Sequence, residues 1–268
     1  MISYPRLITI FAWLSAPLII IVGIYLLLTI DSFGSFGRER LNPQPQDTPR
    51  GLVSLTFDDG WKSVYEEAVP FLDAAGFKGS FYVLTSVWDD ERDRNYMRPS
   101  QAKALYDAGH EVGSHGVLHD ELTKLSETGA RSEIERSKSA IESLGIPVSV
   151  FSFPLGDYNN AVIGMVKDAG YRGAVTTWRE FNTPSDDAYV LKRQQLMNTT
   201  TLEEVKGWID QAIMDDSWLI LTFHEIGIDG REYEITHEMY LEIIKYIQST
   251  GVRVVTVQSG IDMFLEKK

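Results

Sequence analysis

Paired carboxylates and histidines follow several of the apolar runs in this sequence. The runs that end this way are "GLVSLTF", followed by Asp58 and Asp59; "HEVGS", followed by His115 and His119; and "WLILTF", followed by His224. His115 and His119 are four residues apart, a spacing that puts two side chains on one face of a helical turn. Neutral imidazole is a good ligand for zinc and its neighbours. A carboxylate would complete a set of two histidines and one carboxylate, with a position left open for water.

Two adjacent carboxylates could divide the work of such a site. One would bind the cation and the other would act as a base, because a bound cation keeps its ligand ionised and lowers the pKa of a bound water. His224 would remain as a proton donor. The set is typical of metal-assisted hydrolysis of an acyl bond, although an aspartate after a strand is also a common helix cap.

Two other histidines are predicted to have structural roles. His110 opens an apolar run and His237 falls in the first turn of a predicted helix, so neither is expected to bind a metal. Trp61, Trp178 and Trp218 are more often core residues than carbohydrate platforms, but Trp61 directly follows the Asp-Asp-Gly sequence and either role suits it.

Short β-rich runs alternate with amphipathic segments from Gly51 onward. The predicted strands are 51–57, 78–84, 110–114, 148–153, 171–177, 189–196, 218–224 and 252–257. The predicted helices are 63–75, 100–108, 130–144, 159–169, 201–214 and 236–249, the last with Thr236 as its cap. This alternation predicts a parallel sheet covered by helices, either a barrel or an open sheet, with chemistry at the carboxyl ends of the strands.

The N-terminal segment differs in composition from the rest of the chain. Residues 7–30 contain no charged side chain, and this run is long enough to span a bilayer. We therefore predict a signal-anchor transmembrane helix within residues 1–30. Residues 31–50 are rich in Gly, Ser and Pro and predict a flexible tether, so the catalytic domain is expected at 51–268. Arg6 before the span and Asp31 after it favour a catalytic domain outside the cytoplasm.

Composition narrows the classes of ligand. The net charge is -13, and nearly all of the excess acid belongs to residues 51–268, so a nucleic-acid partner is not expected. The chain has no cysteine, so any metal must be held by His, Asp or Glu. Nothing in the sequence indicates a protein partner.

Three motifs, "TFDDG", "SHGVLH" and "LTFHE", occur in this order at successive strand ends. Together they resemble the polysaccharide deacetylases, the NodB-homology or carbohydrate esterase 4 family, over residues 51 to about 260. The resemblance implies an α/β fold: a distorted (β/α) barrel of about seven to eight parallel strands. It also implies a divalent metal, most often Zn²⁺, used to remove N-acetyl or O-acetyl groups from sugar polymers.

The resemblance also assigns roles by position. Asp58 looks like the general base, and Asp59 looks like a metal ligand together with His115 and His119. His224 looks like the general acid that protonates the departing amine.

Two motifs of the family are altered here. The third commonly reads Arg-x-Pro, whereas this chain has "FSFPLGDYN" and lacks that arginine. Arg193 is the predicted substitute that orients the base, and the backbone N–H of Leu155 is the predicted oxyanion donor. The fourth motif is replaced by "AVTTWREFN", in which Trp178 is predicted to line the substrate groove with Trp61.

The leading interpretation is a membrane-anchored, metal-dependent deacetylase of an extracytoplasmic polysaccharide that contains N-acetylglucosamine. An O-acetyl esterase acting on a glycan is the first alternative. A non-catalytic glycan-binding relative is the second, and the retained ligands, base and acid argue against it. The expected partners are a polysaccharide substrate and, through the N-terminal helix, a membrane.

Overall fold

A computed structural model describes residues 51–88, 95–227 and 230–265 of the chain. The predicted signal-anchor helix at residues 1–30 and the predicted tether at residues 31–50 lie outside the described residues. Within the part that is described, no helix is both long and apolar enough to cross a membrane.

Parallel strands form the centre of the domain, as the alternating pattern predicts. The strands of the main sheet are β1 (Leu52–Phe57), β2 (Ser80–Val83), β3 (Glu111–Ser114), β4 (Val150–Ser152), β5 (Gly173–Val175), β6 (Gln194–Gln195), β7 (Trp218–Phe223) and β10 (Arg253–Val254). Seven of them follow the order β5-β4-β3-β2-β1-β7-β6. β10 pairs with the start of β1, and β2 pairs with its end. The carboxyl ends of neighbouring strands therefore adjoin along one edge.

The sheet curves into a half-barrel that is not fully closed. β5 and β6 are not neighbours in the sheet, and an isolated parallel bridge between Val175 and Leu191 spans the gap. The predicted strand at 189–196 is wrong over most of its length. Ala188–Val190 form a 3-10 turn, and only Gln194–Gln195 pair with β7.

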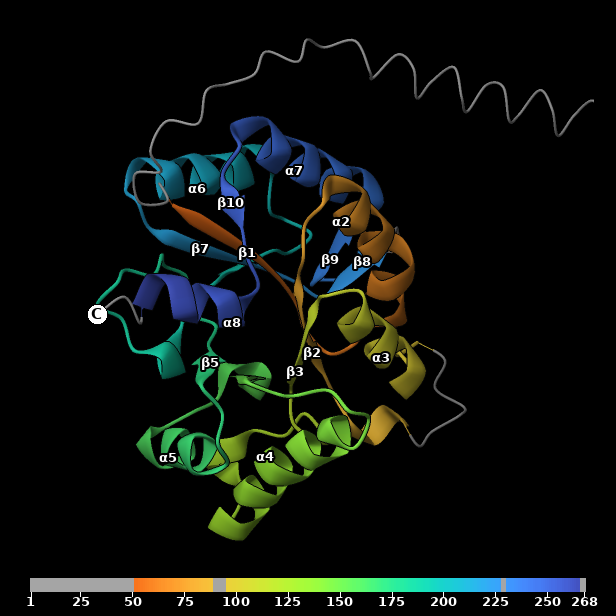
Figure 1. The fold of residues 1–268 in the computed structure, drawn as a ribbon, viewed down its shortest axis with the longest axis vertical. Coiled ribbons are helices and arrows are strands. Elements are labelled where there is room, and N and C mark those ends of the chain that lie inside the picture. The colour runs from red at the N-terminus through yellow and green to blue at the C-terminus, as the bar shows by residue number, and fades with distance from the viewer. Residues whose placement is uncertain (1–50, 89–94, 228–229, 266–268) are drawn as a thin grey trace, which may run out of the picture. The chain divides into compact units, whose positions relative to one another are not determined.

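Helices surround the sheet (Figure 1). They are a π-helical turn at Val64–Ala68 that continues into α2 (Val69–Ala75), then α3 (Pro99–Asp107), α4 (Glu127–Glu142), α5 (Asn160–Asp168), α6 (Leu202–Met214) and α7 (His237–Thr250). The six predicted helices correspond to these elements. The predicted cap of α7 is confirmed, since Thr236 Oγ1 accepts a hydrogen bond from the Met239 N–H at 3.1 Å. A small parallel pair, β8 (Glu225–Gly227) and β9 (Glu234–Thr236), follows β7 and is not apparent in the sequence pattern.

Side chains of β1 alternate between two hydrophobic layers, because successive residues of a strand point to opposite faces. The residues that pack in the outer layer, under the helices, are Val53, Leu55 and Phe57. Leu52 belongs to a separate cluster inside the half-barrel, and Ser54 and Thr56 share its side of the strand. Trp218 Nε1 donates to Ser54 Oγ at 3.0 Å across this interior. All six residues of β1 are buried, so the strand is a rigid support for whatever follows it.

The C-terminal segment fills the amino end of the half-barrel. The predicted strand at 252–257 is wrong beyond Val254, because α8 (Val257–Gly260) and a π-helical turn (Ile261–Leu265) follow. The members of the inner cluster that this segment supplies are Val257, Ile261 and Phe264. Thr256 caps α8 through the Ser259 N–H, so the β-branched run "VVTV" leaves the sheet to cover its interior.

Glu111, the first residue of β3, joins this C-terminal segment to the sheet. Its Oε2 accepts hydrogen bonds from Ser80 Oγ at 2.8 Å and from the Gln258 N–H of α8 at 2.9 Å. Burial raises the pKa of Glu111 above its usual value of 4.5, and these hydrogen bonds oppose that rise only in part.

We expect the stabilising effect of Glu111 to fall as the pH rises. A carboxyl whose pKa is raised by folding contributes stability that is fully present below its unfolded pKa of 4.5 and lost as the pH rises through the folded pKa. The Glu111→Gln variant should therefore gain in urea midpoint relative to the wild type as the pH rises from 4.5 through the folded pKa of Glu111. Glu121→Gln, at an exposed position, serves as the control. A difference between Glu111→Gln and wild type that does not vary with pH would contradict the expectation.

Candidate active site

Side chains alternate between the two faces of each strand, and this alternation places chemically active residues inside the half-barrel, at the carboxyl edge of the sheet. Asp58 comes directly after β1 and continues the inward side that Ser54 and Thr56 occupy. His115 and His224 occupy the corresponding positions after β3 and β7. A cavity of about 290 Å³ opens there, and its lining includes Asp58, Asp59, His115, His119, Arg193 and His224. The structure thus brings together the base, ligand and acid candidates of the sequence analysis.

Asp59, His115 and His119 form a compact set of possible metal ligands. Asp59 Oδ1 lies 3.3 Å from His115 Nε2 and 3.5 Å from His119 Nε2. One ligand atom from each of the three residues lies within 4.8 Å of the others. Three protein ligands that leave a further position for water or substrate are the usual arrangement of catalytic zinc sites.

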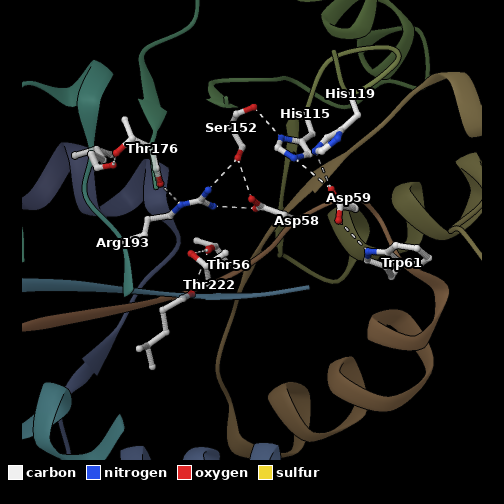
Figure 2. A network of polar contacts seen from close by, with 12 residues as sticks. Thr56, Asp58, Asp59, Trp61, His115, His119, Ser152, Thr176, Arg193 and Thr222 are labelled. Atoms are coloured by element: carbon white, nitrogen blue, oxygen red, sulfur yellow. Dashed lines mark hydrogen bonds and ion pairs between the residues drawn. The ribbon is translucent and has the colours of Figure 1, made fainter. Parts of the chain in front are cut away.

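The hydrogen bonds around the three residues fit a cation at this position. His115 Nδ1 lies 2.8 Å from the Ser152 carbonyl oxygen, so Nδ1 carries the proton and Nε2 faces the other two ligands. Trp61 Nε1 donates to Asp59 Oδ2 at 2.9 Å (Figure 2). The buried Asp59 Oδ1 faces the two imidazoles but accepts no hydrogen bond from any described residue. A buried carboxylate oxygen without a donor is costly unless a charge pairs with it, which a divalent cation would do.

The pKa values of Asp59 and His115 also fit a cation at this position. Burial would raise the pKa of Asp59, but the neighbouring imidazoles of His115, His224 and His119 lower it well below its usual value. The pKa of His115 is raised, because the nearby carboxylates outweigh burial, which alone would lower it. A cation that binds His115 Nε2 would compete with a proton for that atom, so metal affinity should fall as the pH is lowered.

Backbone conformation is unusual at the ligands. Among the non-glycine residues that the structure describes, Asp59, His119, Leu155 and Asp216 have positive φ, and the first three line the cavity. Asp59 has φ 68° and His119 has φ 65°, in the left-handed region that costs L-residues energy. Such strain is concentrated at functional sites, and it turns Asp59 away from the strand direction that Asp58 follows.

Asp58 is held by a separate set of hydrogen bonds (Figure 2). Arg193 Nη1 donates to Asp58 Oδ1 at 2.9 Å, and Ser152 Oγ donates to Asp58 Oδ2 at 3.1 Å. Arg193 also donates from Nε to the Thr176 carbonyl at 2.7 Å and from Nη2 to Ser152 Oγ at 3.3 Å. Arg193 thus makes the contact with Asp58 that its predicted role requires, although the role itself stays a prediction.

This network keeps Asp58 ionised. Burial would raise the pKa of Asp58, but the charge of Arg193, followed by those of His115 and His224, lowers it below its usual value. The side chains of both Arg193 and Asp58 are almost fully buried, with exposed fractions of 2% and 3%. A carboxylate that is both ionised and oriented suits the predicted general base.

His224 lies at the same edge without a fixed partner. Its Nδ1 is buried and makes no hydrogen bond to any described residue, and its ring packs against Tyr233 with ring centroids 5.1 Å apart. Burial lowers the pKa of His224, and the nearby carboxylates Asp58 and Asp59 offset this only in part. The imidazole is therefore mainly neutral near neutral pH and would become an acid where negative charge develops beside it.

Leu155 belongs to a tight turn at the cavity wall. It has φ 56° within the 3-10 turn Pro154–Gly156, and its side chain is 59% exposed. The next two N–H groups, of Gly156 and Asp157, donate to the Phe153 and Pro154 carbonyls. The Leu155 N–H lies in the same turn at the cavity wall, and its role as the oxyanion donor stays a prediction.

The two predicted substrate tryptophans differ in position. Trp61 stacks on Tyr96, with ring centroids 4.5 Å apart, and its main contact with the site is the hydrogen bond to Asp59. Trp178 is 60% exposed and is not among the residues that line the cavity. His110 is structural as predicted, since its Nδ1 accepts a hydrogen bond from the Gly79 N–H at 3.1 Å.

Several residues at the site are not apparent from the sequence. Ser152 contacts the base with its hydroxyl and a metal-ligand histidine with its carbonyl, yet a serine in an apolar strand gives no such signal. The other cavity-lining residues that sequence reasoning missed are Phe153, Gly156, Thr177, Gln195 and Tyr233. They come from the turn after β4, from β6 and from segments elsewhere in the chain, and only the fold brings them together.

Removing the indole N–H of Trp61 should weaken metal binding. We expect Trp61→Phe to lower the affinity for Zn²⁺ by about 10- to 100-fold, the usual effect of losing an outer hydrogen bond to a ligand. Competition with a chromophoric chelator would measure it, and Trp88→Phe is the matched control. An unchanged affinity would mean that the Trp61 hydrogen bond does not orient Asp59.

The fold and the site together define a class of protein: a parallel α/β half-barrel whose carboxyl edge carries an Asp-His-His set that could hold a metal ion, beside a buried, ionised carboxylate. Residues 45–174 match the family model described as polysaccharide deacetylase. The resemblance to this family that was drawn from the three motifs is therefore confirmed.

Individual relatives agree with this assignment. The peptidoglycan-N-acetylglucosamine deacetylase of Bacillus cereus is 25% identical over 207 residues, which cover 77% of this chain and 86% of that protein. The Bacillus subtilis protein YxkH is 27% identical over 142 residues, or 53% of this chain and 50% of that protein. The chain spans half or less of the length of the first curated relatives that it matches.

A solved structure has the same fold. The Xyl-CE4 domain of a multidomain xylanase from the hindgut metagenome of Trinervitermes trinervoides superimposes with a TM-score of 0.58 at 23% identity. The match covers 81% of this chain and 95% of that domain. The predicted α/β architecture of parallel strands is confirmed, with a half-barrel in place of a closed one.

Proposed function

We propose that this protein is a metal-dependent hydrolase that removes N-acetyl groups from an extracytoplasmic polysaccharide containing N-acetylglucosamine. The observation that carries the proposal is the arrangement of two adjacent aspartates. Asp59 faces His115 and His119 as a metal ligand would, and Asp58 is held apart from them as an ionised base. Family membership and the adjoining His224 support the same reaction.

Asp59, His115 and His119 would hold the cation, for which we propose Zn²⁺ on the basis of the two imidazole ligands. When bound, such a cation supplies a Lewis acid that polarises the acetyl carbonyl and lowers the pKa of a water. Asp58 would take a proton from the attacking water, since it is ionised and fixed by Arg193 and Ser152.

Two further groups would act on the acetyl group as the bond to nitrogen breaks. The N–H of Leu155 would donate a hydrogen bond to the carbonyl oxygen as it gains negative charge. That charge would favour uptake of a proton from solvent by the neutral His224, which would then deliver this proton to the departing amine. Asp58 would return the proton of the attacking water to solvent. The products are acetate and a free amino group on the sugar.

Relatives and charge guide the proposed substrate class. The Bacillus cereus relative is named for removing the acetyl group of N-acetylglucosamine in peptidoglycan, and we propose a substrate with the same sugar. A net charge of -13 disfavours strongly anionic polymers and suits a product that gains a cationic amine with each turnover.

The location of the enzyme is part of the proposal. The uncharged run at residues 7–30 lies outside the described residues, and we propose that it anchors the chain in a membrane with the catalytic domain on the outer side. A C-terminal alkaline phosphatase fusion, which is active only outside the bacterial cytoplasm, tests the orientation. An inactive fusion that is still expressed would refute it.

Acetate release from a chitin-type oligomer of N-acetylglucosamine tests the activity. The full chain, purified in detergent, should release acetate with Zn²⁺ present, lose that activity to a chelator and regain it when Zn²⁺ is restored. An O-acetylated glycan assayed in parallel separates the two acetyl linkages. No acetate from any acetylated glycan, with metal added, would refute the enzyme and leave the glycan-binding alternative.

A further inference from the structure

The loop that follows β3 carries both histidine ligands and is built around its own backbone N–H groups. His115 lies at its start and His119 at its end, with Gly116, Val117 and Leu118 between them. None of these three N–H groups belongs to a helix or a sheet, so the loop needs acceptors from elsewhere.

Glu133 supplies an acceptor for two of the three. This residue lies on α4 with an exposed fraction of 6%, and its Oε2 accepts hydrogen bonds from the Val117 and Leu118 N–H groups, both at 2.8 Å. One carboxylate oxygen therefore binds two consecutive amides of the loop.

The third amide is held from the same helix, one turn further on. The Gly116 N–H donates to Ser114 Oγ at 3.2 Å, and Ser114 Oγ lies 2.6 Å from Ser137 Oγ of α4. On the opposite side, the Gly116 and Val117 carbonyls accept hydrogen bonds from the Thr85 and Ser86 N–H groups at 3.3 and 3.0 Å. The loop is thus fixed on both sides, and the Glu133 carboxylate makes the shortest hydrogen bonds to the backbone of residues 116–118.

We propose that Glu133 is the positioning residue of the metal site: its carboxylate fixes residues 115–119 so that the Nε2 atoms of His115 and His119 converge on Asp59. The inference rests on the proposed metal-dependent function. His119 has φ 65°, a conformation that the loop would leave if its amides were released. Glu133 does not touch substrate or metal, and its effect on the reaction passes through the two imidazoles.

Two variants separate the reach of the side chain from its charge. Glu133→Asp keeps the charge but withdraws the oxygen by about one bond length, roughly 1.5 Å, too far to bind both amides. Glu133→Gln removes the charge but keeps an oxygen at the same reach. Glu135→Asp, at an exposed position on the same helix, is the matched control.

The readout is binding of Co²⁺, measured on the full chain by its visible absorption, and of Zn²⁺ by chelator competition. We expect Glu133→Asp to bind Co²⁺ about 10- to 100-fold more weakly than wild type and with an altered spectrum. Glu133→Gln should restore the wild-type spectrum and an affinity within about threefold.

Three results would overturn the proposal. One is a Glu133→Asp variant with wild-type affinity and spectrum, and another is a Glu133→Gln variant as impaired as Glu133→Asp, which would point to charge. The third is a wild type that binds neither metal, which would refute the proposed metal-dependent function together with this inference. In the first two cases the wild type still binds metal and releases acetate, so the proposed function survives.

Discussion

Asp58→Asn should reduce acetate release by roughly a thousandfold or more while Zn²⁺ stays bound, because general base catalysis is commonly worth 10²–10⁴-fold. Asparagine has the same shape and can still accept a hydrogen bond from Arg193 through its amide oxygen. It cannot take a proton from water. The measurements are kcat for deacetylation and the zinc content of the same purified sample.

Asp59→Asn is the matched control for this substitution. Asp59 Oδ1 faces both histidine ligands, so its variant should lose zinc as well as activity. If Asp58→Asn lost the metal and Asp59→Asn kept it, the two aspartates would have the opposite roles. A circular dichroism spectrum of each variant is needed, since Asp58→Asn leaves the buried Arg193 without its counter-charge.

Arg193→Ala should cause the largest loss of stability among these substitutions. It would leave the buried Asp58 carboxylate without its guanidinium partner, and breaking a buried ion pair by removing one member typically costs about 3–5 kcal/mol of the free energy of unfolding. With burial unopposed by Arg193, the pKa of Asp58 should rise. The displaced base should also lower kcat by about 100-fold, with less effect on KM.

The pH dependence of Arg193→Ala distinguishes this mechanism from simple loss of packing. The pKa of Asp58 is lowered by folding, so its contribution to stability is present above 3.8 and lost as the pH falls through the folded pKa. The stability gap between wild type and variant should therefore be wider at neutral pH than in acid, as urea denaturation would measure. Arg193→Lys should fall between them, because a lysine keeps the charge without the fork of donors. An equal gap at all pH values would refute the role of the charge.

The positions of the strand-end residues of this site can be predicted from the geometry of a parallel sheet. Residues that follow buried strands collect at one edge, and period-two alternation decides which of them face inward. Asp58, His115 and His224 obey both rules, so the sequence pattern predicts their convergence. Arg193 was predicted only as a substitute for an absent arginine, and its contact with Asp58 depends on a loop path that no periodicity encodes.

Other features depend on tertiary contacts without a local signature. In the sequence, Glu133 is indistinguishable from the other polar residues of an amphipathic helix. Its two hydrogen bonds to the loop after β3 follow from the way α4 packs beside β3. The C-terminal run "VRVVTV" has the composition of a strand, but Val257 packs in the inner hydrophobic cluster at the open amino end of the half-barrel. The positive φ values of Asp59 and His119 cannot be predicted from their residue types alone.

Ser152 joins the predicted base to one predicted metal ligand through two different oxygens. Its hydroxyl binds Asp58 and its carbonyl binds His115, so a shift of the His115 ring is transmitted to the residue that positions the base. The ionic radius of the bound cation would therefore affect proton transfer as well as ligation. We expect a larger ion such as Cd²⁺ at the proposed metal site to shift Asp58 through Ser152, and so to slow turnover even where it binds tightly.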